Sequence, residues 1–103
     1  MPSHIHLLLE IDGLLLSGFM RDFKKFTAQK SLAQFAVNGK LWQDGYDRFP
    51  LNNYNTLTIK LNYIHQNPVK AALVDSPIGW YWSSARDYLS DEPGPLPIWK
   101  GWA

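Results

Sequence analysis

The segment His4-Ile5-His6 places two imidazole side chains two residues apart near the start of the sequence. In an extended strand, residues two apart point to the same face, so both rings are expected to project side by side. Two adjacent neutral imidazoles can supply half of the ligands of a divalent metal ion. The same pattern also occurs on partly exposed polar faces, so the histidine pair alone does not identify a metal site.

A second group of reactive side chains lies in residues 63–68, Tyr-Ile-His-Gln-Asn-Pro. Tyr63 and Asn67 are four residues apart, so on a helix they share one face. A phenol and a carboxamide arranged in this way can present a nucleophile beside a metal-coordinating oxygen. A tyrosine in an amphipathic helix is also often a core or rim aromatic, and an asparagine before proline often ends a helix. His65 is offset from this face, and we expect it to be a surface or capping residue.

The elements that must position these side chains can be read from hydrophobic periodicity and turn residues. Residues 3–10 are short and apolar-rich and predict a strand. Ser17 fits the N-cap of a helix that reaches roughly to Gln34. This helix is amphipathic, with a basic outer side and an apolar face that contains Phe19, Phe23 and Phe26.

The second half of the sequence predicts one more strand and two more helices. Residues 41–49 favour a less regular strand. Asn55 can cap a helix over residues 56–67, which Pro68 should end because proline disfavours helical geometry in the residue before it. Ser83 or Ser84 can start a last short helix through Leu89, and three prolines then indicate an extended tail.

The composition limits the class of protein. A chain of 103 residues suffices for one small domain. A formal net charge of +1 does not indicate nucleic-acid binding by itself, so the positions of the basic residues matter. The absence of cysteine excludes disulfides and thiolate metal sites. Glu10 and Asp12 interrupt the apolar N-terminal residues, and no apolar run is long enough to span a membrane. We therefore expect a soluble, cytoplasmic protein without a membrane partner.

Five segments in a fixed order resemble the IS200-like transposases, particularly the REP-associated tyrosine transposases of the HUH, single-tyrosine (Y1) group. The matching segments are Met-Pro-Ser-His-Ile-His-Leu-Leu-Leu at 1–9, Phe-Met-Arg-Asp-Phe-Lys-Lys-Phe-Thr at 19–27, Leu-Trp-Gln at 41–43, Tyr-Ile-His-Gln-Asn-Pro-Val-Lys-Ala at 63–71 and Trp-Ser-Ser-Ala-Arg-Asp-Tyr at 82–88. Each segment is weak evidence alone, whereas the ordered set across residues 1–89 is specific.

The resemblance implies an α+β fold, a ferredoxin-like sandwich of the HUH endonuclease type with an antiparallel sheet and helices on one face. Members of the family usually have a strand and a helix before the His-x-His segment, so we expect the first strand and helix to be lacking here. Residues 1–89 would form this shortened transposase domain, and residues 90–103 a Pro- and Trp-rich C-terminal tail. An exposed sheet edge would favour pairing with a second copy as a homodimer.

The resemblance also implies a chemistry. His4, His6 and Asn67 would bind Mg²⁺ or Mn²⁺, and Tyr63 would attack single-stranded or hairpin DNA to give a 5′-phosphotyrosine and a free 3′-hydroxyl. Such a covalent intermediate allows the strand to be rejoined without ATP. DNA-phosphate contacts are predicted for a set of basic residues, although a solvated face is an equal alternative for any single one. The set is Arg21, Lys24, Lys25, Arg48 and Lys70, with Lys30 nearby.

Two other functions are consistent with the sequence. One is a catalytically inactive DNA-binding remnant of such a transposase, because the expected scaffold is shortened. The other is a structural or protein-interaction module that uses the basic helix and the Trp-rich tail. Trp42 and Tyr46 can stack on unpaired bases, although core packing is the preferred interpretation for Trp42. Trp80 and Trp82 are expected to pack against the rest of the domain.

Overall fold

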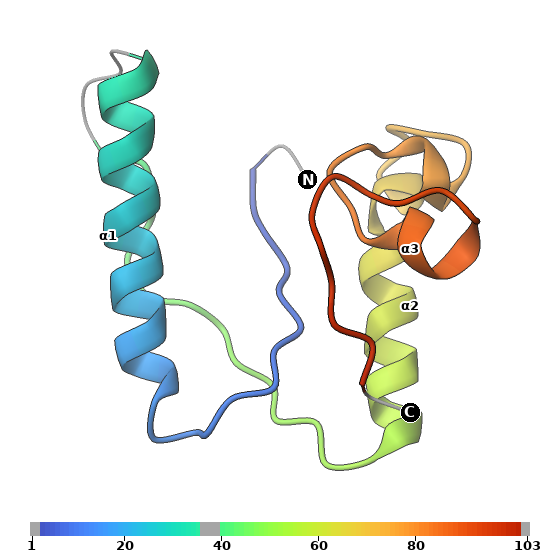
Figure 1. Cartoon of the computed structure of the whole chain (residues 1–103), viewed down its shortest axis with the longest axis horizontal. Helices are drawn as coiled ribbons and strands as arrows, with labels where there is room; N and C mark the ends of the chain where they lie inside the picture. The colour runs from blue at the N-terminus through green and yellow to red at the C-terminus, as the bar shows by residue number, and fades with distance from the viewer. Residues whose placement is uncertain (1–2, 36–39, 102–103) are drawn as a thin grey trace. The chain divides into compact units, whose positions relative to one another are not determined.

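The computed structural model of the chain describes residues 3–35 and 40–101. The elements follow one another as α1 (Leu16–Phe35), α2 (Tyr54–Lys70), the short 3-10 helix η1 (Pro77–Gly79) and α3 (Ala85–Leu89) (Figure 1). None of these helices is long and apolar enough to cross a membrane.

The chain divides into two compact units. Unit 1 combines Met1–Leu8 with Pro50–Ala103, and unit 2 is Leu9–Phe49. The first residues of the chain therefore belong with α2, η1 and α3, whereas α1 belongs to the other unit. This division matters for function because His4, His6, Tyr63 and Asn67 all fall in unit 1.

Helix α2 is longer than the sequence predicts at both ends. Its N-cap is Asn53 rather than Asn55, and the Asn53 Oδ1 accepts a hydrogen bond of 2.9 Å from the backbone N–H of Thr56. Pro68 lies inside the helix and is buried, so the expected end at Asn67 is wrong. Proline removes one backbone donor, crowds the carbonyl four residues earlier and disfavours helical geometry in the preceding residue. The helix nevertheless continues to Lys70, with Pro68 buried. The helix therefore carries Tyr63, Asn67 and Lys70 on one continuous backbone.

The core of unit 1 is built around His65. This side chain is only 2% exposed, and its Nε2 forms a hydrogen bond of 2.8 Å with the Oγ of Ser84. The centroid of its ring lies 5.4 Å from that of the Tyr88 ring on α3. Ala85, the residue after Ser84, is fully buried. The expectation that His65 is a surface or capping residue is therefore wrong. The predicted start of the last helix is confirmed, since α3 begins directly after Ser84.

Unit 2 is organised by α1. The ring of Phe23 lies 5.9 Å from that of Trp42, and the Trp42 Nε1 donates a hydrogen bond of 2.8 Å to the Oγ1 of Thr27. Trp42 is half-buried, which agrees with the preferred interpretation of packing rather than base stacking. Lys24 donates a hydrogen bond of 3.0 Å to the carbonyl of Gln43, so α1 and the segment after it are joined by polar as well as aromatic contacts.

The expected ferredoxin-like α+β sandwich is wrong. Within residues 3–35 and 40–101 no backbone segment forms a β-strand, and residues 4–12 and 45–52 have no regular secondary structure. A strand needs a neighbour for its N–H and C=O groups, and a short apolar-rich segment does not provide that neighbour. Ile5 and Leu7 are 54% and 45% exposed, so the first segment does not cover a sheet core.

Candidate active site

Three of the side chains singled out in the sequence lie together in unit 1. The rings of His4 and His6 have centroids 4.8 Å apart, with their planes at 87°. The ring of His6 also meets that of Tyr63 edge to face, at 5.8 Å and 83°. The N-terminal segment and α2 therefore bring two imidazoles and a phenol to one place, although they are far apart in the sequence.

The two histidines differ in their surroundings. Partial desolvation lowers the pKa of His6, and the neighbouring His4 lowers it further. A lowered pKa favours the neutral imidazole, which is the form that binds metal ions. His4 shares a hydrogen bond of 3.1 Å between its Nδ1 and the Oγ of Ser3. This bond orients the His4 ring and directs Nε2 as its potential ligand atom.

The spacing of the two imidazoles fits a shared divalent ion. With ring nitrogens about 2.1 Å from an ion, two neighbouring imidazole ligands have ring centres about 4.6 Å apart at an octahedral angle and about 5.3 Å apart at a tetrahedral angle. The 4.8 Å between His4 and His6 falls in that range. Among the described residues, no three His, Asp or Glu side chains lie together as a possible metal site. A further protein ligand would therefore be a neutral oxygen, and the Asn67 amide, one helical turn beyond Tyr63, is of that type.

Tyr63 belongs to a polar stripe along α2, formed by Lys60, Tyr63, Asn67 and Lys70. At 3.6 residues per turn, these four positions fall within an arc of about 80°. The Nζ of Lys60 lies 5.8 Å from the centroid of the Tyr63 ring, and the Nζ of Lys70 lies 5.9 Å from it. The Tyr63 side chain is 45% exposed. The stripe thus presents an accessible phenol between two ammonium groups.

The remaining predicted DNA-binding residues all lie in unit 2. Arg21, Lys24 and Lys25 are on α1, and Arg48 lies near the end of the unit. The Arg21 guanidinium forms an ion pair of 3.1 Å with Asp22, and Lys24 is bound to backbone carbonyls. Lys25 and Arg48 are exposed. Lys70 is the member of the predicted set that lies in unit 1, where its ammonium group is 5.9 Å from the centroid of the Tyr63 ring.

Sequence reasoning missed the contact of Lys60 with the Tyr63 ring. Its signal was present in the sequence, because Lys60 precedes Tyr63 by three residues and so shares its helix face. Sequence reasoning also misplaced Trp82, which is 72% exposed rather than packed. The neighbouring Tyr81 ring lies 4.7 Å from the Trp82 ring. A tryptophan in an irregular segment has no periodicity from which its burial can be read.

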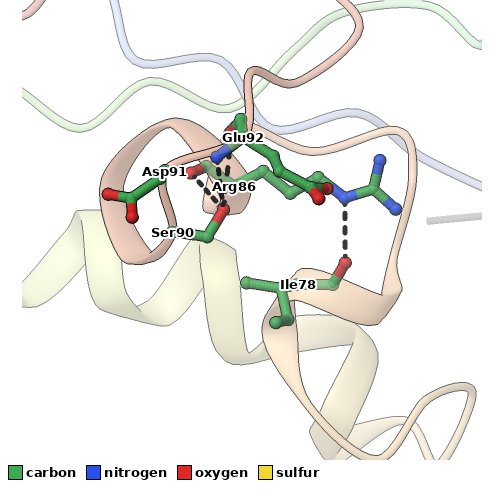
Figure 2. A pocket seen from close by; sticks show the side chains of 5 residues that line it. All are labelled: Ile78, Arg86, Ser90, Asp91 and Glu92. Atoms are coloured by element: carbon green, nitrogen blue, oxygen red, sulfur yellow. Dashed lines mark hydrogen bonds between the residues drawn. The ribbon is translucent and has the colours of Figure 1, made fainter.

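A separate open hollow of about 420 Å³ lies between η1 and the end of α3 (Figure 2). It is lined by Ile78, Arg86, Ser90, Asp91 and Glu92. The Arg86 Nε donates a hydrogen bond of 3.2 Å to the carbonyl of Ile78, and Figure 2 shows this bond at the rim. None of the predicted site residues lines this hollow, and its two carboxylates do not favour a phosphate ligand. The candidate site residues lie in the N-terminal segment and on α2 instead.

Comparison with known families agrees with the ordered motifs. A family model described as "Transposase IS200 like" matches residues 1–67, which is more than half of the chain. The chain belongs to the IS200-like transposase family. Membership of this transposase family implies interaction with DNA. Neither the curated proteins nor the solved structures gave a match.

The match to the IS200-like transposases includes both histidines, Tyr63 and Asn67, and it ends at that asparagine. Unit 1 continues beyond it through η1 and α3, where Ser84 binds His65. The residues that contact His65 of α2 thus lie outside the matched residues, whereas all four candidate site residues lie inside them.

Proposed function

We propose that this IS200-like transposase chain cleaves and rejoins single-stranded or hairpin DNA through a covalent 5′-phosphotyrosine at Tyr63. The observation that carries the proposal is the 5.8 Å contact between the His6 and Tyr63 rings. The His6 ring also contacts that of His4, and the phenol is 45% exposed and so accessible to a DNA strand. Family membership supports the class of reaction.

In the proposed step, the Oη of Tyr63 attacks the phosphorus of a phosphodiester. The bond between phosphorus and the 3′ oxygen breaks as the new phosphorus–Oη bond forms. The phenol loses its proton, and the leaving 3′ oxygen gains one to become a hydroxyl, so the step needs no oxidant and no nucleotide. Attack by another 3′-hydroxyl on the phosphotyrosine reverses these changes and joins two strands.

His4, His6 and Asn67 would hold Mg²⁺ or Mn²⁺ at this site. When bound, such an ion supplies positive charge that polarises a phosphate oxygen. The protein itself orients the nucleophile, because the His6 ring and the phenol ring pack in a T-shaped contact. The Asn53 cap and the bond between His65 and Ser84 stabilise α2, and a rigid helix keeps Tyr63 and Asn67 one turn apart.

The proposal is tested by replacing Tyr63 with phenylalanine, which keeps the ring and removes Oη. With labelled single-stranded hairpins and Mn²⁺, the parent protein should form a covalent adduct that survives a denaturing gel. Tyr63→Phe should form none. Tyr54→Phe is a matched control, because Tyr54 is an exposed tyrosine at the first position of the same helix. Equal adduct from the two variants would show that Tyr63 is not the nucleophile.

A non-catalytic DNA-binding protein is the second candidate. It keeps the interaction with DNA that family membership implies, and it needs no third metal ligand beside His4 and His6. This function predicts DNA binding that weakens with salt and does not change when EDTA replaces Mn²⁺. A covalent protein–DNA adduct under any metal condition excludes it.

A further inference from the structure

We propose that Lys60 and Lys70 form a two-point phosphate-binding site around Tyr63, which holds the backbone of the strand to be cleaved. The inference rests on the proposed function and extends it to the residues that bind the substrate backbone. Its basis is geometric: the two ammonium groups lie 5.8 Å and 5.9 Å from the centroid of the same phenol ring.

The two lysines reach Tyr63 from opposite directions along the helix. Lys60 precedes it by one turn, and Lys70 follows it by two turns, on the same face of α2. A strand that crosses the exposed Tyr63 side chain therefore meets an ammonium group on each side of the nucleophile. Two fixed contacts restrain both the position and the direction of a flexible single strand, which one contact cannot do.

The charge of α2 supports an anionic ligand. The helix contains no Asp or Glu, and its sequence is Tyr-Asn-Thr-Leu-Thr-Ile-Lys-Leu-Asn-Tyr-Ile-His-Gln-Asn-Pro-Val-Lys. Both of its lysines lie on the stripe that carries Tyr63, and both are exposed. The stripe therefore concentrates positive charge where a phosphodiester must approach the phenol, whereas the whole chain has a net charge of only +1.

The alternative is that the two ammonium groups only pack against the Tyr63 ring as cation–π partners. The two roles differ in their response to salt. Each phosphate contact of a single strand contributes about 0.7 to the slope of log K against log salt concentration, because counterions are released on binding. Packing against an aromatic ring contributes nothing to that slope.

The test is DNA binding of the full chain in the Tyr63→Phe background, with EDTA present. This background keeps the ring and prevents cleavage, so binding is measured without turnover. The probe is a fluorescein-labelled single-stranded oligonucleotide followed by anisotropy, with salt varied from about 50 to about 200 mM. Lys60→Met and Lys70→Met remove the charge and keep the aliphatic stem. Lys60→Arg restores the charge.

Each Met variant should reduce the magnitude of the salt slope by about 0.7, and the double variant by about 1.4. At 0.1 M salt, each single loss corresponds to about five-fold weaker binding. Lys60→Arg should bind like the background. Lys40→Met is the control for net charge, because Lys40 lies in unit 2 and is paired with Asp44. Its slope should not change.

An unchanged slope in Lys60→Met and Lys70→Met would overturn the inference, and so would an equal loss in Lys40→Met. Failure of the Tyr63→Phe background itself to bind the oligonucleotide would also overturn the inference. Failure of the proposed function is seen separately, as absence of an adduct with the parent chain and Mn²⁺. A reduced slope in the lysine variants together with no adduct would retain the phosphate-binding site and reject the nuclease.

Discussion

Ser84→Ala tests whether the buried contact between α2 and the C-terminal part of unit 1 stabilises the fold. The Oγ of Ser84 lies 2.8 Å from the Nε2 of His65, a side chain that is 2% exposed. Alanine leaves this ring nitrogen buried without its partner, because water reaches so little of the side chain. Leaving a buried polar group unsatisfied costs about 1 to 3 kcal/mol of unfolding free energy.

This cost can be converted into a melting temperature. For a domain of roughly this size, 1 kcal/mol shifts Tm by about 4 to 8 °C. Ser84→Ala should therefore lower Tm by about 4 to 24 °C, which circular dichroism at the helical minimum can measure. Ser84→Thr retains a hydroxyl at this position and should lose less stability than Ser84→Ala.

Ser76→Ala provides the matched control. Ser76 is an exposed serine that precedes η1, and its side chain makes no cap hydrogen bond. Its replacement should leave Tm unchanged. The reasoning is refuted if Ser84→Ala and Ser76→Ala melt at the same temperature as the parent, since the bond to His65 would then contribute no stability.

Two further predictions concern pH and capping. Burial lowers the pKa of His65 against the opposing effect of Asp87, so the folded state takes up a proton less readily than the unfolded state. Stability should therefore fall as the pH drops below about 6.5, and urea unfolding in EDTA should show a weaker pH dependence for His65→Gln than for the parent. Equal dependence would contradict this. Asn53→Ala should cost about 0.5 to 2 kcal/mol in urea unfolding, unlike Asn52→Ala in the preceding coil; equal costs would reject Asn53 as the cap.

The helices were predicted more accurately than any other feature. The helix expected to follow an N-cap at Ser17 and to reach roughly Gln34 is observed as α1, Leu16–Phe35, so its end is close to the prediction, whereas Ser17 lies inside the helix and is not its N-cap. The last helix begins after Ser84 as expected. Helices depend on neighbours three and four residues away, so their apolar periodicity and capping residues are visible in a local stretch of sequence.

The strands could not be predicted in this way. The apolar residues in 3–10 and the aromatic residues in 41–49 favour strands, but a strand exists only when another strand binds its backbone groups. That pairing is a property of the whole molecule, and the described residues form no such ladder. The ferredoxin-like sandwich inferred from the family resemblance failed for this reason.

Only part of the candidate site could likewise be predicted from the sequence. The sequence by itself determined the residue types, the order of the motifs and the helical register that places Asn67 and Lys60 on the face of Tyr63. It also determined the family, which the match over residues 1–67 confirms.

Only the tertiary structure decided which of these groups meet. It brought the His6 ring to Tyr63, separated the basic residues of α1 into another unit and buried His65 against Ser84. Tyr63 and His65 are two residues apart and so point to nearly opposite sides of α2, and the sequence alone does not decide which of the two sides faces inward. Packing in unit 1 buries His65, and its hydrogen bond to Ser84 offsets the cost of burying the ring. Tyr63 is 45% exposed.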